Sequence, residues 1–112
     1  MKQNEIWLIN LDPTVGAEIQ KTRPAVIVND NSLGILPLKI IVPITDWKEK
    51  YESAPWMVKI EPNQFNCLNK LSSADCFQIR SLSQERFVRK IGILKESEMS
   101  NIRYGLSKIL SI

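Results

Sequence analysis

Histidine is missing altogether from these 112 residues, and cysteine and glycine are scarce, with two and four copies. Histidine is the usual proton-transfer group near neutral pH, so any chemistry must rely on arginine, lysine, carboxylates, hydroxyls or thiols. The two cysteines, Cys67 and Cys76, form no CxxC pair, and no histidine is present to complete a zinc site. We therefore expect reduced, packing cysteines in a cytoplasmic protein, and neither a metal nor another cofactor.

Long apolar runs are also absent, and no run approaches the roughly twenty residues that a membrane-spanning helix needs. Residues 1–5 lack the apolar stretch of a secretory signal, so we expect one cytoplasmic domain without a membrane anchor. The net charge is +3, and basic residues gather between positions 70 and 90. Such a band suits a phosphate-bearing partner, although an ordinary solvated surface has the same appearance.

What the chain does contain is a series of short apolar and β-branched runs bounded by turn residues, which predicts strands. The expected strands are 5–11, 24–29, 38–42, 57–60, 72–80 and 87–94. Pro43 is expected to end the third strand, and residues 12–22 to form a long polar loop. From Met99 to Leu110 apolar residues recur every three or four positions, which predicts a C-terminal helix with Ser97 as its N-cap. The pattern favours a mainly β fold, a small barrel or sandwich with one helix.

Two residues stand where a rigid strand could aim a polar side chain. Arg23 precedes Pro24, which holds it extended and fixes a guanidinium at the rim of the sheet. Thr45 follows the buried third strand, so its hydroxyl is aimed by a strand end. Each alone is more simply an ordinary rim or turn residue. Together they suit phosphodiester chemistry, in which fixed donors stabilise charge developing on phosphorus.

Aromatic side chains offer a second functional hint. Trp47 and Trp56 lie in or beside the polar segment after Thr45. Exposed aromatic rings near basic residues can stack unpaired bases, but core packing or a dimer interface explains them equally well.

Three sequence blocks resemble the MazF/PemK family of toxin endoribonucleases. The blocks are 5–24, with EIWL, LDPT and Arg23-Pro24; 42–45, with VPIT; and 68–86, with Leu68, Ser72, QIRSL and Arg86. They follow the family order and span nearly the whole chain. The resemblance implies a small SH3-like barrel with a C-terminal helix, which acts as a homodimer and cleaves single-stranded mRNA at specific sequences without a metal. It also implies a cognate antitoxin, for which we expect a disordered acidic tail.

The resemblance also implies roles for individual residues. Arg23 and Thr45 match the catalytic arginine and threonine of the family, and the 12–22 loop matches its mobile loop. The residues expected to contact RNA or line its site are Glu18, Lys21, Trp47, Ser72, Asp75, Gln78 and Arg80.

The chain departs from the family pattern at three positions. Lys21 and Cys67 stand where the family usually has glycine, and Phe77 stands where it often has an acidic residue that serves as the base. The nearest acid is Asp75, which in a continuous strand would share a face with Phe77, about 7 Å away along the strand. The identity of the general base is left open between Asp75, Glu18 and a substrate-assisted route.

Two other functions fit the same barrel. CcdB-like toxins use it to bind DNA gyrase without catalysis, but their gyrase contacts resemble a C-terminal end that contains tryptophan, and this chain has none after Trp56. An inactive barrel kept as a binding module is the third hypothesis, and only the Phe77 departure supports it.

Overall fold

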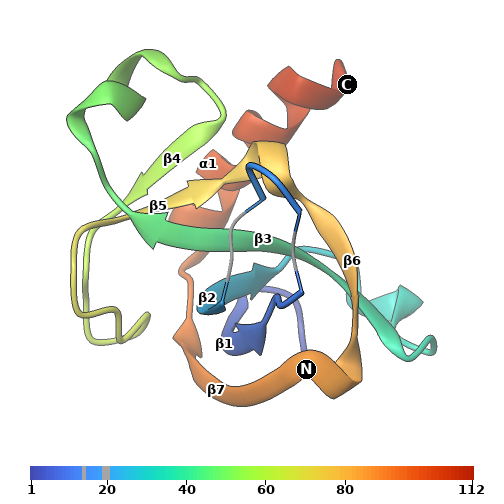
Figure 1. Ribbon diagram of the computed structural model, residues 1–112. Helices are drawn as coiled ribbons and strands as arrows, with labels where there is room; N and C mark the ends of the chain where they lie inside the picture. Colours follow the sequence, from blue (N-terminus) through green and yellow to red (C-terminus); the bar gives the residue numbers. More distant parts are fainter. Residues whose placement is uncertain (14, 19–20) are drawn as a thin grey trace.

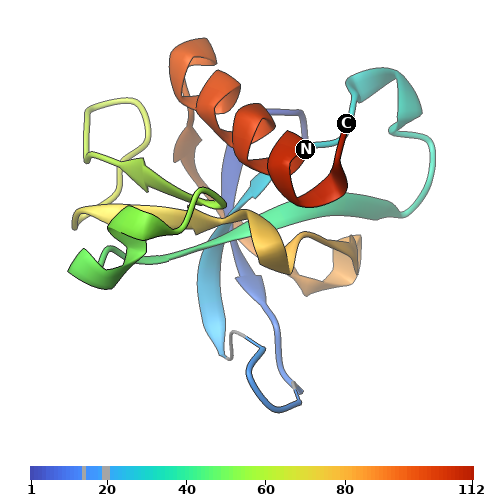
Figure 2. The same ribbon diagram turned by 90° about the horizontal axis from the view of Figure 1, so that it is seen from above.

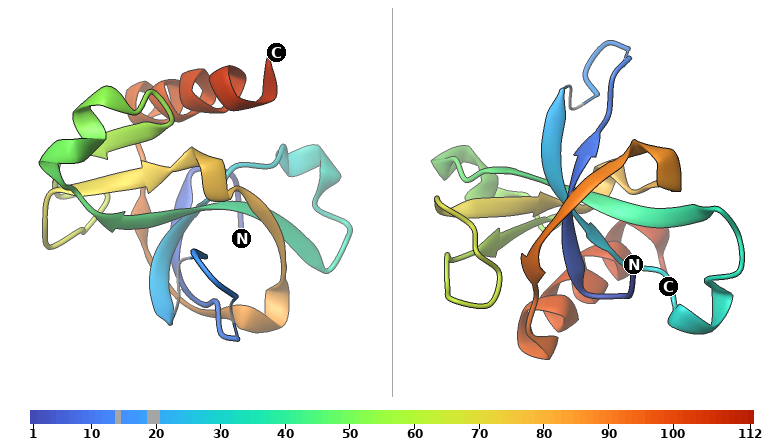
Figure 3. Two further views of the ribbon diagram at one scale, coloured as in Figure 1. Left: turned by 45° about the horizontal axis from the view of Figure 1, so that its top comes forward. Right: turned by 90° about the horizontal axis from the view of Figure 1, so that it is seen from below.

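A computed structural model describes residues 1–13, 15–18 and 21–112. Seven strands form one strongly curved antiparallel sheet, and a single α-helix follows them (Figure 1). The strands are β1 (Glu5–Asn10), β2 (Thr22–Ile27), β3 (Leu38–Asp46), β4 (Met57–Ile60), β5 (Ser72–Asp75), β6 (Arg80–Ser83) and β7 (Phe87–Ile93), and the helix is α1 (Glu96–Leu110). The expected mainly β fold with a C-terminal helix is confirmed. The sheet curls toward a barrel, but its hydrogen-bonded path ends at β4 and β7 (Figure 3).

Strand β3 organises the sheet, because it pairs with three other strands. It lies beside β2 on one edge, and on the other edge it pairs first with β6 and then with β5. We expected Pro43 to end this strand, and that prediction was wrong: β3 continues to Asp46. The β6 register ends at Ile41 and the β5 register begins at Ile44, so Pro43 falls where the partner changes and a missing N–H is tolerated.

Alternation along the strands builds two apolar clusters on opposite faces of the sheet. Val26, Val42 and Ile44 face α1, where they pack with Met99 and Ile102 of the helix. On the other face, the second cluster contains Ile9, Leu11, Ala25, Ile27, Ile41 and Leu82. Figure 2 shows α1 on one side of the sheet and the segment after β1 on the opposite side.

The helix begins slightly earlier than its sequence indicated. Its N-cap is Lys95 rather than Ser97, and the Glu98 carboxylate accepts the Lys95 backbone N–H at 2.9 Å. Gly105, which weakens a helix in isolation, allows close packing here, since a Cβ at this position would lie 2.9 Å from the sulfur of Cys76. No helix in the described part of the chain has the length and apolar character needed to cross a membrane.

A second difference concerns residues 72–80, which we expected to form one strand. They form β5 and β6 with a single 3₁₀ turn, η3 (Cys76–Gln78), between them. The turn exists because the Asp75 carboxylate accepts the Phe77 N–H at 3.1 Å and caps it. Asp75 and Phe77 therefore do not share a strand face, contrary to the expected alternation.

Candidate functional site

Arg23 and Thr45 come from neighbouring strands at the same end of the sheet. The last pair in the β2–β3 ladder joins Ala25 and Pro43, and the same register continued by two residues places Arg23 opposite Thr45. On the other side of β3, Thr45 pairs with Ser73 of β5. Side chains opposite one another in antiparallel strands lie on the same face. Arg23, Thr45 and Ser73 therefore lie on the same face of the sheet, the one turned away from α1, with Arg23 and Thr45 each two residues beyond the last β2–β3 pair. We call these three residues the row.

Both predicted catalytic side chains are held by ordered strands and are partly exposed. Arg23 pairs with buried Ile9 of β1, and the following Pro24 pairs with Leu8. The backbone at Arg23 is therefore fixed by the ladder as well as by the proline. The guanidinium and the Thr45 hydroxyl lie where a phosphate could contact them without entering the core.

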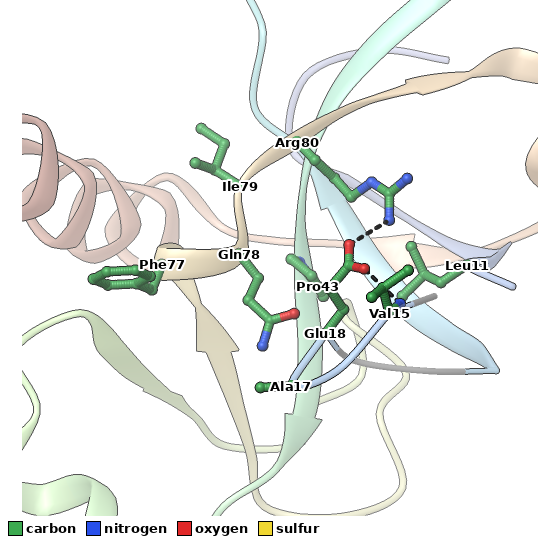
Figure 4. Close-up of a pocket in the computed structure, with 9 residues that line it drawn as sticks. All are labelled: Leu11, Val15, Ala17, Glu18, Pro43, Phe77, Gln78, Ile79 and Arg80. Carbon is green, nitrogen blue, oxygen red and sulfur yellow. Dashed lines mark hydrogen bonds and ion pairs between the residues drawn. The ribbon is translucent and has the colours of Figure 1, made fainter. Parts of the chain in front are cut away.

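A pocket of about 550 Å³ opens on this side of the molecule. Its lining residues are Leu11, Val15, Ala17, Glu18, Pro43, Phe77, Gln78, Ile79 and Arg80 (Figure 4). Pro43 places it beside the row, because Pro43 and Thr45 alternate onto the same face of β3. Glu18 accepts the Val15 N–H at 2.6 Å and lies 3.9 Å from the Arg80 guanidinium. The ion pair thus joins the segment after β1 to the start of β6.

Asp75 lies at the edge of the same face, two residues beyond Ser73 along β5. Its carboxylate accepts the Phe77 N–H and, at 3.2 Å, the side-chain amide of Gln78. Burial raises the pKa of Asp75 above the ordinary aspartate value, and these hydrogen bonds only partly oppose that shift. The Asp75 carboxylate is thus partly buried and accepts hydrogen bonds from two neighbouring donors.

The remaining predicted RNA contacts differ in their settings. Trp47 is partly exposed, and the Lys59 ammonium lies 5.0 Å from the centre of its ring. Lys21 is exposed, and its N–H donates to Asp12 at the base of the loop. Ser72 is buried on the face toward α1, and its hydroxyl donates to the Lys70 carbonyl at 2.8 Å. Ser72 therefore lies on the opposite face of the sheet from Thr45 and Ser73. Within the predicted 12–22 loop, residues 14, 19 and 20 are outside the described residues.

Sequence reasoning missed two polar residues on this face. Ser73 is fully buried, and its hydroxyl has no hydrogen-bond partner among the described residues. Lys59 of β4 pairs with Ser73 and continues the row outward. The alternation of Met57–Ile60 already placed Lys59 on the polar side of its strand. Only the β3–β5 register could show that Ser73, and not Ser72, lies beside Thr45.

The basic band between residues 70 and 90 is not one surface. Lys70 lies 3.9 Å from Asp46, and Lys90 lies 3.2 Å from Glu5. Arg86 donates to the carbonyls of Asn10 and Asp12 and so supports the base of the loop. Arg80 is the member of this band that lines the pocket.

Comparison with known proteins identifies relatives that match nearly the whole chain. The chain is 32% identical to a protein of Staphylococcus epidermidis named endoribonuclease MazF, with 100% of this chain and 92% of that protein covered. It is 29% identical to the endoribonuclease PemK of Escherichia coli, covering 99% of this chain and 83% of that one. A crystal structure of MazF from Deinococcus radiodurans superimposes with a TM-score of 0.83 at 19% identity, covering 100% of this chain and 97% of that one.

The sequence profile of the PemK-like, MazF-like toxins of type II toxin–antitoxin systems matches residues 2–110, almost the whole chain. The strands that carry Arg23 and Thr45, the pocket and the terminal helix all fall within this match. The chain therefore belongs to the family of PemK-like and MazF-like toxins.

Proposed function

We propose that this chain is a toxin endoribonuclease that cleaves single-stranded RNA at specific sequences, without a metal ion. The observation that carries the proposal is that Arg23 and Thr45 face the same side of the sheet, beside a pocket to which Glu18, Gln78 and Arg80 contribute polar groups. Relatives that match the chain over nearly its whole length are named endoribonucleases. The gyrase-binding alternative has no comparable support, since the matching family and these relatives are of the MazF/PemK type.

The chemistry uses the RNA's own 2′-hydroxyl as the nucleophile. Its oxygen forms a bond to the adjacent phosphorus as the bond to the 5′ oxygen breaks, which leaves a cyclic phosphate. Negative charge increases on the non-bridging oxygens during this step. The Arg23 guanidinium and the Thr45 hydroxyl donate hydrogen bonds to those oxygens, and preorganised donors of this kind supply a large part of catalysis.

Asp75 is the carboxylate best placed to accept the 2′-hydroxyl proton. It lies on the same face as Thr45, and its raised pKa makes it a better base than an ordinary aspartate once it is ionised. Glu18 is less suited to the task, because its carboxylate lies beside the positively charged Arg80 guanidinium, whereas the two donors to Asp75 are neutral. A water molecule supplies the proton that the leaving 5′ oxygen requires.

The assembly we propose is a homodimer inhibited by an antitoxin. Apolar side chains exposed in and before the first half of β3 suit a dimer interface: Leu33, Ile35, Leu36, Leu38 and Ile40. One solved structure with this fold is titled as an endoribonuclease in complex with its cognate antitoxin. A disordered acidic tail would fit over Arg23 and Arg80, and both partners would act in the cytoplasm.

RNA cleavage by the purified protein tests the proposal. We expect cutting of single-stranded RNA to continue at the same rate in excess EDTA, and the 3′ ends of the products to carry a cyclic phosphate. Sequencing of RNA ends would give the recognised sequence. Cleavage that requires added magnesium or zinc would exclude the mechanism, and binding to gyrase without RNA cleavage would exclude the function.

A further inference from the structure

Phe77 lines the pocket with an exposed aromatic ring, and 65% of its surface is accessible. Single exposed apolar side chains are common on protein surfaces, but this ring stands at a pocket, beside polar groups that could contact a ligand. In Figure 4 the Phe77 ring projects at one end of the pocket, while Gln78 and Arg80 extend from the same segment toward Glu18.

The Phe77 ring is held firmly, although it is exposed. It contacts Trp56 edge to face, with 5.7 Å between ring centres and 64° between ring planes. Trp56 is itself packed against the main core cluster, and its carbonyl accepts the Cys76 N–H at 3.0 Å. The Asp75 carboxylate fixes the backbone of Phe77 through the cap of η3. Because the ring is already ordered, stacking a ligand on it costs little conformational entropy.

Polar groups suited to a nucleobase adjoin this ring. The Gln78 amide offers a donor and an acceptor for a base edge, and the Asp75 carboxylate orients that amide by accepting one of its N–H groups. Arg80 offers positive charge toward a phosphate. An aromatic face flanked by an amide and an arginine is a common arrangement for unpaired bases in RNA. Stacking requires an exposed ring, which Phe77 offers.

We propose that Phe77, held by Trp56, is a base-stacking residue that binds one unpaired nucleobase of the RNA and contributes to sequence choice at that position. The inference rests on the proposed ribonuclease function and deepens it. Phe77 is then a binding residue rather than the site of a lost catalytic acid, and Gln78 reads the edge of the stacked base.

The test uses the sequence cut by the parent protein, synthesised with a 2′-deoxy sugar at the cleavage position so that it binds without reacting. The fluorescent base 2-aminopurine replaces each nucleotide in turn. We expect quenching at one position with the parent and with Phe77→Tyr, and loss of that quenching with Phe77→Leu. Loss of one stacked base should weaken binding roughly 5- to 100-fold. It should raise KM more than it lowers kcat, and relax the sequence preference at that nucleotide.

Phe65→Leu is the matched control, because Phe65 is also an exposed ring, at 48%, but does not line the pocket. It should bind and cut RNA as the parent does. If Phe77→Leu binds RNA as the parent does, the inference is overturned but the proposed function is not. The same holds if Phe77→Leu weakens only the binding of an acidic, apolar antitoxin peptide. A parent protein that cuts no RNA would overturn the proposed function and this inference with it.

Discussion

The two faces of the sheet formed by β3 and β5 differ in polarity, although the same strands supply both. Toward α1, the side chains of Ile44 and Ala74 are buried in a continuous apolar cluster closed by Met99 and Ile102. On the opposite face, at the same end of the same strands, Thr45 and Ser73 form a polar row with a pocket beside it. Adjacent residues in one strand thus face the apolar core and the proposed site in turn.

The comparison explains how so small a domain can hold polar side chains in fixed positions. A strand with one face packed against a helix cannot shift its register without moving apolar side chains into water. The position of Thr45 is therefore set by the burial of Ile44 beside it. Preorganisation on the polar face is a consequence of packing on the apolar face. If this is right, substitutions on the two faces should affect activity and stability separately.

The largest effect should come from the polar face. We expect Arg23→Ala and Thr45→Ala each to lower kcat about 100- to 1000-fold, since each removes a preorganised donor worth roughly 3–4 kcal/mol. Both side chains are partly exposed, so the free energy of unfolding should change by less than about 1 kcal/mol. Single-turnover RNA cleavage and thermal unfolding measure the two quantities. An Arg23→Ala protein that cuts at the parent rate would refute the catalytic assignment.

The apolar face should show the reverse pattern. Ile102 is fully buried between α1 and the sheet, so Ile102→Ala should lower the free energy of unfolding by about 3 kcal/mol through the cavity it leaves. Denaturant unfolding measures this loss. At low temperature, where the protein stays folded, the rate of RNA cleavage should remain within a few-fold of the parent. A loss of activity as large as that of Thr45→Ala in a folded sample would show that the two faces are not separable.

Asp75 should combine both kinds of effect, because it is a partly buried group on the polar face. As the base it must be ionised, so cleavage should increase with pH through a pKa above the ordinary aspartate value of about 3.9. Asp75→Asn should remove this rise and lower the rate roughly 100-fold. A pH–rate profile of both proteins tests the assignment. An unchanged profile would transfer the role to Glu18 or to the substrate.

The same substitution has a predictable effect on stability. The raised pKa means that the folded protein holds the Asp75 proton more tightly than the unfolded chain does. This contribution favours the folded state below the unfolded pKa and is lost as pH rises through the folded pKa. Asp75→Asn should therefore be more stable than the parent at pH 7. The difference should shrink as the pH falls through the folded pKa and should be lost below about 4, the pKa of the unfolded chain. Denaturant midpoints at the two pH values measure it.

The local sequence predicted which strands and helix form better than it predicted where they end. The C-terminal helix and the strands expected at 57–60 and 87–94 follow from their residue patterns, and the structure has β4 at Met57–Ile60 and β7 at Phe87–Ile93. Pro43 misled the prediction because a proline's tolerance depends on which partner strand lies beside it. The 72–80 segment misled it because the cap formed by Asp75 stops β5, and a side-chain cap can override an apolar pattern.

The site was predictable only in part, for a related reason. Arg23 and Thr45 could be named from the resemblance, and their placement in one row needed the register of β2, β3 and β5. Ser73 could not be distinguished from Ser72, because alternation gives two faces without saying which is the core. The exposure of Phe77 followed from η3, which no local pattern indicated.

The smallest effect should come from Lys21 and Cys67, where the family usually has glycine. Both adopt left-handed backbone angles, with φ of 71° and 55°, and both are exposed. A residue with a Cβ pays about 1–2 kcal/mol in this conformation, while a glycine adds roughly 0.5–1 kcal/mol of unfolded-state entropy. We therefore expect Lys21→Gly and Cys67→Gly each to raise the free energy of unfolding by about 0.5 kcal/mol.

Lys48→Gly is the control for the first of these, because Lys48 is an exposed lysine with an extended backbone at φ −133°. It removes the same charge without relieving any strain, so it should lower stability by about 0.5–1 kcal/mol. Denaturant unfolding of the three variants resolves differences of opposite sign. If Lys21→Gly were as destabilising as Lys48→Gly, the lysine side chain would stabilise the left-handed backbone at position 21. The departure from glycine would then be a gain in stability for this chain rather than a tolerated strain.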